Sequence, residues 1–355
     1  MTNNQDWGSV VSRATGVLVI LAGILLGANL CTASPLNDNP VPSIFQPRST
    51  PAESIYQLSV FVLAITGVIF VIVFTLLTYA VLKFRSRANR DNRGEPPQVY
   101  GSMQIELAWT IIPILIVVVL FLASVRVIHG IQDAPTPPVA VEITVVGHQY
   151  WWEFRYPGFG IVTANELHVP VSNTAHPTPT FLNLLSADTD HSFWVPQLAG
   201  KTDLIPNHPN RMWIDPHETG VYLGQCAQYC GVQHAKMLLR VYVQTQAEFD
   251  RWVQEQSRTA TMTEAVSRGR AVFETNECLD CHRIKGIAGD GQFGPDLTHL
   301  MSRDTIASGV ALNTPENLRR WVKDPNSIKP GATMPALQLS DGQLNDVIAY
   351  LETLR

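Results

Sequence analysis

Four metal-binding side chains lie within the twelve-residue run CAQYCGVQHAKM: Cys226, Cys230, His234 and Met237. Two thiolates, an imidazole and a thioether form a ligand set that suits copper. A mononuclear blue-copper centre uses a single cysteine, and a structural zinc site does not use methionine. The second cysteine and the methionine therefore indicate another kind of copper centre. A disulfide between the two cysteines, with an incidental histidine and methionine, is the alternative.

A second cluster, Cys278-Leu-Asp-Cys281-His282, has the spacing of a c-type haem attachment site. In such a site two thioethers hold the haem vinyl groups and the histidine binds the iron from one side. Met334, within Gly-Ala-Thr-Met-Pro, is the candidate for the second axial ligand, where a thioether raises the potential of the iron. A thiol–disulfide redox motif is the alternative, but it leaves Met334 unexplained.

The copper run resembles the CuA loop of cytochrome c oxidase subunit II, in which two cysteines bridge two copper ions. That family takes a further histidine from a segment Asp-x-x-His-Ser-Phe-Trp-Val-Pro, which is present here at residues 188–196. The ligands implied by the resemblance are His191, Cys226, the main-chain carbonyl of Gln228, Cys230, His234 and Met237.

Gln228 departs from the family, which usually has Glu at this position. A main-chain carbonyl ligand survives the change, because it does not depend on the side chain. In the family, however, the glutamate carboxylate helps to hold a magnesium ion against subunit I. A neutral amide oxygen is a weaker ligand for a hard cation, so we expect at most a weak magnesium site at Gln228.

The flanks of the haem motif resemble cytochromes c, with Gly269 and Phe273 on an expected helix before it and Tyr350 on the terminal helix. From about residue 54 to residue 355 the chain is similar to the caa-type branch of the oxidases, in which subunit II carries a fused cytochrome c. The resemblance implies an electron relay from a cytochrome c-type donor through this haem and the copper pair to subunit I. There O2 is reduced to water with proton translocation.

The resemblance also implies two residues outside the metal clusters. The family has an aromatic segment at which electrons enter through a tryptophan. Here Tyr150 stands at the usual position and Trp151 is its neighbour, although such rings also serve a strand core. Glu106 matches a residue at the mouth of a proton channel into subunit I; the alternative is a helix N-terminal acid favoured by the dipole.

The composition, 46% hydrophobic and 15% charged, favours membrane segments over one large soluble core. Apolar stretches at 14–30, 56–82 and 107–125 precede the metal motifs. The basic side chains between the last two stretches make that loop cytoplasmic by the positive-inside rule: Lys83, Arg85, Arg87, Arg90 and Arg93. A buried helical hairpin of a soluble protein is the alternative. A net charge of -5, without a basic cluster beside stacking aromatics, argues against nucleic-acid binding.

Short alternating apolar runs between residues 141 and 243 predict a β-sandwich or barrel, and helical patterns follow from residue 246. We therefore expect a multidomain membrane protein with an α-helical transmembrane hairpin, a cupredoxin-like β-barrel or sandwich and an all-α class I-type cytochrome c domain. The expected bounds are 1–33 for a signal peptide or extra span, 34–53 for a linker, 54–83 and 104–129 for transmembrane helices around a cytoplasmic loop at 84–103, 138–245 for the copper domain, 246–263 for a linker helix and connector, and 264–355 for the haem domain.

The resemblance places the chain in a bacterial-type plasma membrane, multi-pass, with both metal domains on the outer, periplasmic side. The expected partners are oxidase subunits I and III, a cytochrome c-type donor and membrane lipid. The catalytic O2 site lies in another subunit, because this sequence has no residues resembling the catalytic haem–copper ligands. Two rivals stay open: a CuA-bearing subunit of a nitric-oxide reductase, and a free-standing membrane electron carrier.

Overall fold

The structure, a computed structural model, describes residues 42–85, 98, 101–135, 140–173, 177–259, 266–287 and 289–355. The expected leader, Cys31 and the arginines at positions 87, 90 and 93 lie outside the described residues.

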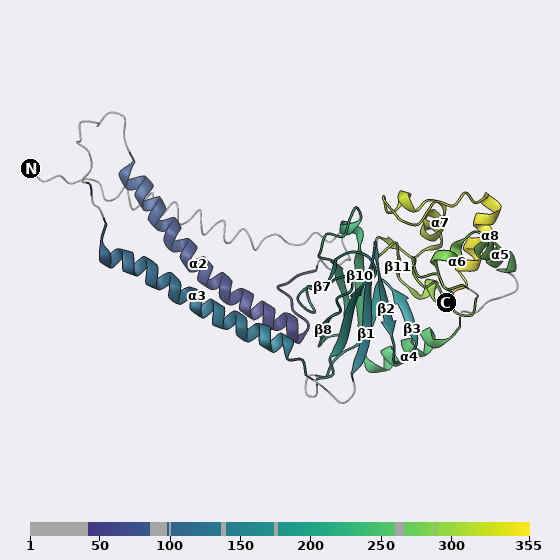
Figure 1. The fold of residues 1–355 in the computed structure, drawn as a ribbon, viewed down its shortest axis with the longest axis horizontal. Coiled ribbons are helices and arrows are strands. Elements are labelled where there is room, and N and C mark those ends of the chain that lie inside the picture. Colours follow the sequence, from purple (N-terminus) through teal and green to yellow (C-terminus); the bar gives the residue numbers. More distant parts are fainter. Residues whose placement is uncertain are drawn as a thin grey trace, which may run out of the picture. The chain divides into compact units, whose positions relative to one another are not determined.

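Two long helices, α2 (Thr50–Phe84) and α3 (Met103–Gln132), open the described chain and pack beside each other (Figure 1). Their most apolar windows are 0% buried within the structure. At 1.5 Å per residue they are about 52 and 45 Å long, more than the roughly 30 Å hydrocarbon core of a bilayer. Both helices are thus long and apolar enough to cross a membrane.

In the described part of the chain, ten strands follow and form two five-stranded sheets. The first sheet has the order β3-β2-β1-β5-β8 and the second the order β4-β10-β9-β6-β7. The β1–β5 and β4–β10 pairs are parallel, and the other pairs are antiparallel. The strand bounds are β1 (Val141–His148), β2 (Trp151–Tyr156), β3 (Ile161–Ala164), β4 (Glu166–Pro170), β5 (Thr180–Ser186), β6 (His191–Trp194), β7 (Thr202–Leu204), β8 (Asn210–Ile214), β9 (Gly220–Cys226) and β10 (Leu238–Gln244).

The two sheets share one apolar core. In β10, buried Leu239, Val241 and Val243 alternate with more exposed neighbours, as a strand with one buried face requires. The first sheet adds the rings of Trp152 and Phe154 to this core. The β-sandwich predicted from the alternating pattern is confirmed, and the short helix η2 (His234–Lys236) joins β9 to β10.

Helix α4 (Gln246–Ser257) leads out of the sandwich into a C-terminal domain with its own apolar core. Its principal helices are α5 (Ser267–Thr275), α7 (Pro315–Lys323) and α8 (Asp341–Leu351), with the short elements α6 (Cys278–Cys281), η4 (Leu300–Ser302), β11 (Thr305–Ile306), β12 (Ala311–Leu312) and η5 (Pro325–Ser327). A capping box formed by Ser340 and Gln343 begins α8.

Helices α5 and α8 pack closely because Gly269 has no side chain. A Cβ at this position would lie 2.7 Å from Cβ of Tyr350 and would overlap the backbone of Asp346. The rings of Phe273 and Tyr350 meet beside this crossing, with their centroids 5.8 Å apart. The helix expected to carry Gly269 and Phe273 therefore crosses the terminal helix at Tyr350, directly before the segment that carries Cys278 and Cys281.

Candidate metal centres

The four metal-binding side chains of the 226–237 run converge at one end of the sandwich. The Sγ atoms of Cys226 and Cys230 lie 3.9 Å apart. His234 Nδ1 is 3.8 Å from Cys230 Sγ, and Met237 Sδ is 3.9 Å from the same sulfur. Both thiols are buried and free, so a disulfide between them is not what the structure shows.

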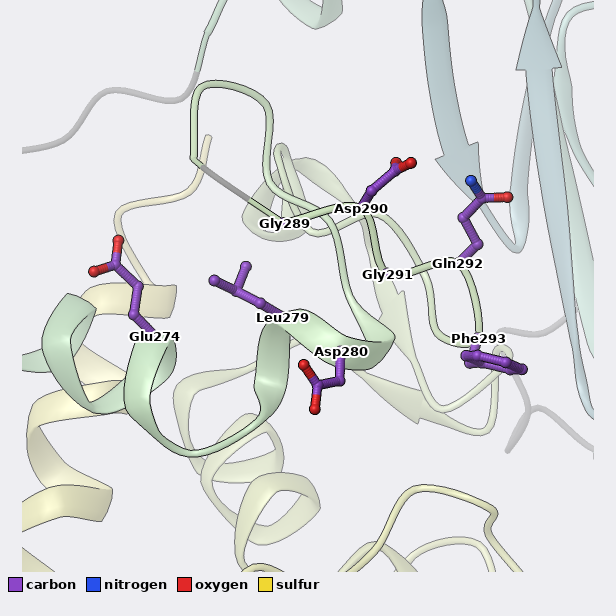
Figure 2. A pocket seen from close by; sticks show the side chains of 8 residues that line it. All are labelled: Glu274, Leu279, Asp280, Gly289, Asp290, Gly291, Gln292 and Phe293. Atoms are coloured by element: carbon purple, nitrogen blue, oxygen red, sulfur yellow. The ribbon is translucent and has the colours of Figure 1, made fainter.

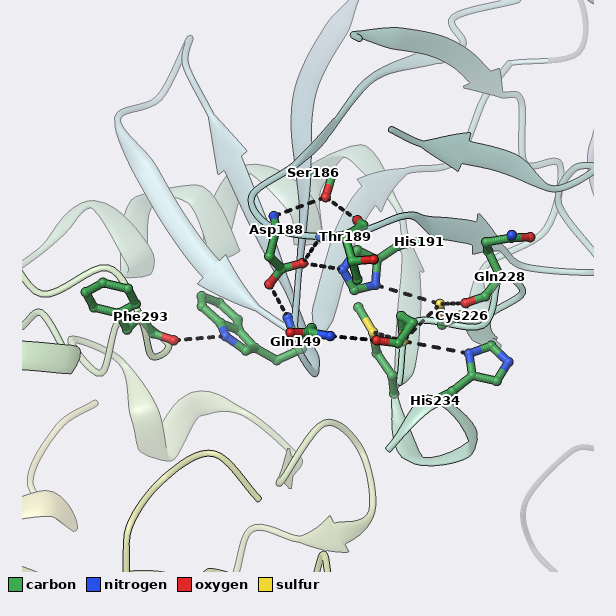
Figure 3. Close-up of polar contacts among 12 residues, drawn as sticks. Gln149, Ser186, Asp188, Thr189, His191, Cys226, Gln228, His234 and Phe293 are labelled. Atoms are coloured by element: carbon green, nitrogen blue, oxygen red, sulfur yellow. Dashed lines mark hydrogen bonds and ion pairs between the residues drawn. The ribbon is translucent and has the colours of Figure 1, made fainter. Parts of the chain in front are cut away.

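His191 reaches the same cluster from another strand. It begins β6, which pairs with β9 so that Phe193 faces Cys226, and its Nδ1 lies 3.9 Å from Cys226 Sγ. The main-chain carbonyl of Gln228 is 3.1 Å from the same sulfur (Figure 3). The ligand atoms of His191, Cys226 and Cys230 lie within 4.8 Å of one another. The six predicted donors are thus brought together, and their chemistry fits a soft-metal centre.

Asp188 orients His191, a role that was not anticipated. Its Oδ1 lies 2.8 Å from His191 Nε2, which leaves Nδ1 directed at Cys226 (Figure 3). A metal-bound histidine commonly donates its other ring N–H to a carboxylate, which fixes the ring and its tautomer. The spacing of Asp188 three residues before His191 was the available signal. Burial lowers the pKa of His191, but the hydrogen bonds with Asp188 and Cys226 outweigh this and raise it overall.

The two thiols influence each other. The hydrogen bond with Cys230 lowers the pKa of Cys226, and this effect outweighs the opposing effect of burial. The pKa of Cys230 rises, because its neighbour takes the negative charge first and because the site is buried. One thiol of the pair therefore loses its proton readily and the other keeps it, because two adjacent negative charges repel each other. A cysteine binds a metal ion only as the thiolate.

Gln149 ties the copper loop to the aromatic segment. Its side-chain Nε2 donates to the Cys230 carbonyl at 2.7 Å, and its backbone N–H donates to Asp188 Oδ2 at 2.6 Å (Figure 3). Gly231 has a φ of +133°, and a Cβ there would collide with the Tyr150 ring. The loop geometry therefore depends on a glycine after the second cysteine and on one amide side chain.

The haem motif has a similar supporting loop. Cys278 and Cys281 lie on the single-turn helix α6, and the next residue, His282, donates from Nδ1 to the Pro295 carbonyl at 2.7 Å. This bond leaves Nε2 for a metal, and burial lowers the pKa of His282, which keeps the ring neutral as a ligand must be. A Cβ at Gly294 would lie 2.5 Å from His282 Cε1, so the loop fits closely against the ring. This donor set fits a covalently held haem.

Met334 lies between η5 and α8 and is half-buried. Among the described residues, the His282 ring bonds to the Pro295 carbonyl, and no hydrogen bond joins Met334 to His282.

A shallow depression of about 640 Å³ lies beside the haem motif (Figure 2). Leu279 and Asp280 of α6 line it together with Glu274 and the segment 289–293. Cys278, Cys281 and His282 do not line this depression. We therefore do not assign it as the place where the motif holds a haem.

Comparison with known protein families divides the chain into three matches. Residues 38–127 match the transmembrane domain of cytochrome c oxidase subunit II, and residues 176–244 match its periplasmic domain. Residues 266–355 match cytochrome c. Cytochrome c oxidase subunit 2 of Alkalihalophilus pseudofirmus is 34% identical over 316 residues, which cover 87% of this chain and 90% of that protein. The chain belongs to the cytochrome c oxidase subunit II family.

Two further relatives of this oxidase subunit show the range of the family. Cytochrome c oxidase subunit 2 of Bacillus subtilis is 31% identical over 338 residues, 89% of this chain and 92% of that protein. Quinol oxidase subunit 2 of Bacillus spizizenii is 31% identical over 225 residues, 61% of this chain and 67% of that protein. The chain is thus subunit II of a haem–copper terminal oxidase with a C-terminal cytochrome c domain, as predicted from its motifs. Nothing in the comparisons supports the nitric-oxide reductase or carrier alternatives.

In this oxidase subunit, both candidates for electron input lie beneath the cytochrome c domain. Trp151 is 8% exposed, and its ring stacks on His148 with centroids 4.2 Å apart. Its Nε1–H donates to the Phe293 carbonyl at 3.3 Å, in the loop that supports His282 (Figure 3). Tyr150 presents its carbonyl to the same domain, where Lys329 donates to it at 2.7 Å.

The other two predicted positions are exposed. Glu106 lies in the first turn of α3, on a helix without buried residues. The Gln228 side chain is exposed at the tip of the copper loop, although its carbonyl faces Cys226. Among the described residues, Glu106 belongs to no group of His, Cys, Asp and Glu side chains close enough together to hold a metal ion.

Proposed function

We propose that this chain accepts electrons from a cytochrome c-type donor and passes them, through its own haem domain and copper domain, to subunit I of the oxidase. The observation that carries the proposal is the presence of two donor sets in one chain, the six-donor cluster around Cys226 and the haem motif supported by Pro295. The O2 chemistry and the coupled proton translocation belong to the partner subunit.

The copper ligands in this proposal are His191, Cys226, the Gln228 carbonyl, Cys230, His234 and Met237. A dinuclear copper centre held there, like a haem held by Cys278 and Cys281, supplies reversible one-electron transfer. The protein excludes water from the sulfurs by burying Cys226, Cys230 and Met237. It also fixes the His191 ring through Asp188, so that little rearrangement is needed when the charge of the site changes.

His282 and Met334 are the proposed axial ligands of the haem iron. The Pro295 carbonyl holds His282 in the tautomer that presents Nε2. Met334 is half-buried in an irregular segment, where a thioether ligand favours reduced iron. A high potential suits a centre that receives electrons from a cytochrome and passes them on.

A cytochrome c donor is preferred over a quinol, although one relative is named a quinol oxidase subunit. A chain that carries its own cytochrome c domain has a one-electron acceptor suited to another cytochrome. Tyr150 and Trp151 are the proposed positions at which electrons reach the copper domain, because both contact the haem domain. The proposed partners are therefore subunits I and III and an external cytochrome.

Membrane topology follows from the basic loop. The positive charges between residues 83 and 93 support a cytoplasmic position for the loop at 84–103 by the positive-inside rule. The multi-pass chain then carries its copper and haem domains on the outer side of a bacterial-type plasma membrane, with domain bounds at 54–83, 104–129, 138–245 and 264–355. Residues 1–33 form a cleaved leader or an extra span in this scheme.

Glu106 begins the second span near the cytoplasmic surface, which supports its proposed role at the entrance of a proton channel in subunit I. Gln228 has an exposed neutral side chain, so any magnesium ion there would be weakly held.

The test is gas consumption by the complex, purified from native membranes through a tag on this chain. Reduced cytochrome c is supplied, and O2 is compared with NO. We expect rapid, cyanide-sensitive O2 uptake. NO turnover without appreciable O2 uptake would move the protein to the reductase class, and absence of a haem-bearing partner subunit would favour a free-standing carrier.

A further inference from the structure

The hairpin of β11 and β12 projects from the haem domain onto the copper domain. Its turn contains Ala307 and Ser308 with φ values of +54° and +57°. The left-handed region is unfavourable for residues with side chains, so such a turn persists where its surroundings hold it. The contacts around this turn lie mainly in the copper domain.

Glu166, the first residue of β4 in the copper domain, accepts three hydrogen bonds from the hairpin. The backbone N–H of Asp304 donates at 3.1 Å, the N–H of Thr305 at 2.8 Å, and the Thr305 hydroxyl at 2.7 Å. Glu166 and Thr305 are only 2% and 3% exposed. A buried carboxylate is costly unless donors surround it, and the donors of Glu166 come from the other domain.

The hairpin turn makes a second group of contacts, beside the metal-ligand loop. The Ser308 hydroxyl lies 2.6 Å from the Tyr150 carbonyl and 3.3 Å from Asn165 Oδ1. The backbone N–H of Leu238, which follows the ligand Met237, donates to the Ser308 carbonyl at 3.2 Å. The turn thus bonds to the β1–β2 connection, the β3–β4 connection and strand β10 of the copper domain, the last directly after the proposed ligand Met237.

A third group of contacts lies outside the hairpin. Gln233, which precedes the ligand His234, donates to the carbonyls of Lys329 and Pro330 at 2.9 and 3.0 Å. Tyr242 of β10 donates to Asp304 Oδ2 at 2.6 Å. Gln233 and Lys329 are 2% and 3% exposed. Contacts this well buried distinguish the surface from the loose, polar interfaces that usually join domains within a chain.

We propose that the β11–β12 hairpin is a docking element that seats the haem domain in one fixed position on the copper domain, with Glu166 as its acceptor and positioning residue. The distance between the two metal sites is then set by this interface and not by the length of chain that joins the domains. A flexible tether alone would raise the encounter frequency but would leave orientation free. This docking contact is separate from the route by which electrons enter the chain, because it concerns how the haem domain is held on the copper domain.

The first test is amide hydrogen exchange of the full chain within the purified oxidase. Glu166→Gln keeps the size of the side chain but presents an amide N–H group to donors of the hairpin. Loss of one of the three hydrogen bonds that Glu166 accepts should speed exchange in residues 303–312 by about tenfold. Glu142→Gln, on an exposed residue of β1, is the matched control and should leave exchange unchanged. Equal exchange in wild type and Glu166→Gln, or an equal rise in the control, overturns the proposal.

The second test separates a docking contact from general weakening of the copper domain. Thr305→Val removes a hydroxyl that bonds to Glu166, so its effect on exchange should be non-additive with that of Glu166→Gln. Full additivity of the two substitutions overturns the assignment of Glu166 as the acceptor.

The third readout is functional and rests on the proposed function. Glu166→Gln should slow electron equilibration between haem and copper several-fold, while both metal spectra and the KM for the external cytochrome stay at wild-type values. An unchanged equilibration rate refutes the positioning role. Loss of a metal spectrum in the wild-type chain would instead refute the proposed function, and it would leave the exchange result standing.

Discussion

Replacing Asp188 by asparagine tests whether the copper site depends on a residue that is not itself a ligand. Asp188 Oδ1 lies 2.8 Å from His191 Nε2 and accepts the Thr189 N–H at 2.6 Å, while Oδ2 accepts the Gln149 N–H at 2.6 Å. All three partners act as donors to the carboxylate. An asparagine has only one acceptor oxygen, so its NH2 group must face at least one of these donors.

The expected loss of copper affinity is that seen when other metal sites lose a carboxylate that orients a histidine ligand. Loss of a carboxylate that orients a metal-bound histidine costs about 10- to 100-fold in metal affinity. This corresponds to roughly 1.4 to 2.7 kcal/mol. We expect the lower part of that range if the introduced asparagine turns its oxygen to His191, and the upper part if it turns its NH2 group there.

The assay is copper retention by the purified oxidase during titration with a copper chelator, followed by the electron paramagnetic resonance signal of the site. Asp190→Asn is the control, because Asp190 is an exposed acid in the same loop. The haem absorption should be the same in all variants. Equal copper retention in Asp188→Asn and Asp190→Asn would refute the argument that Asp188 holds His191 for the metal.

Three further outcomes are expected. Cys226→Ser should abolish the copper signal and leave the haem spectrum intact; retained mixed-valence copper would refute the ligand assignment. Met334→Ala should keep the haem covalently attached but lower its potential in a redox titration, whereas an unchanged potential would point to another axial ligand. Burial raises the pKa of Glu153, but its hydrogen bonds with His148 and Arg155 outweigh this and lower it to about 2 from 4.5. Its ionised form should therefore stabilise the copper domain fully above about pH 4.5, by on the order of 3 kcal/mol, and progressively less as the pH falls towards 2. The difference in thermal midpoint between wild type and Glu153→Gln should shrink over this window, and a constant difference would contradict the assigned pKa.

Local sequence patterns were enough to predict the two long helices, the β-sandwich and each metal motif. The 226–237 run and the haem motif are short, so their donors are held close by the chain itself. The apolar stretches indicated the long helices α2 and α3, and the short alternating apolar runs between residues 141 and 243 predicted strands such as β10. In each case the signal and the structure lie within a few turns of helix or one strand.

Contacts between distant segments were decided by the tertiary structure. His191 was assigned to the copper cluster by resemblance, and it reaches Cys226, 35 residues away, because β6 and β9 pair in a definite register. Glu166 accepts a hydrogen bond from Thr305, 139 residues away, and no sequence pattern within either segment predicts this contact. Strand register and the seating of one domain on another are fixed by packing over the whole fold. The sequence by itself therefore determined which groups this protein uses for electron transfer, whereas the tertiary structure decided how its two domains hold them together.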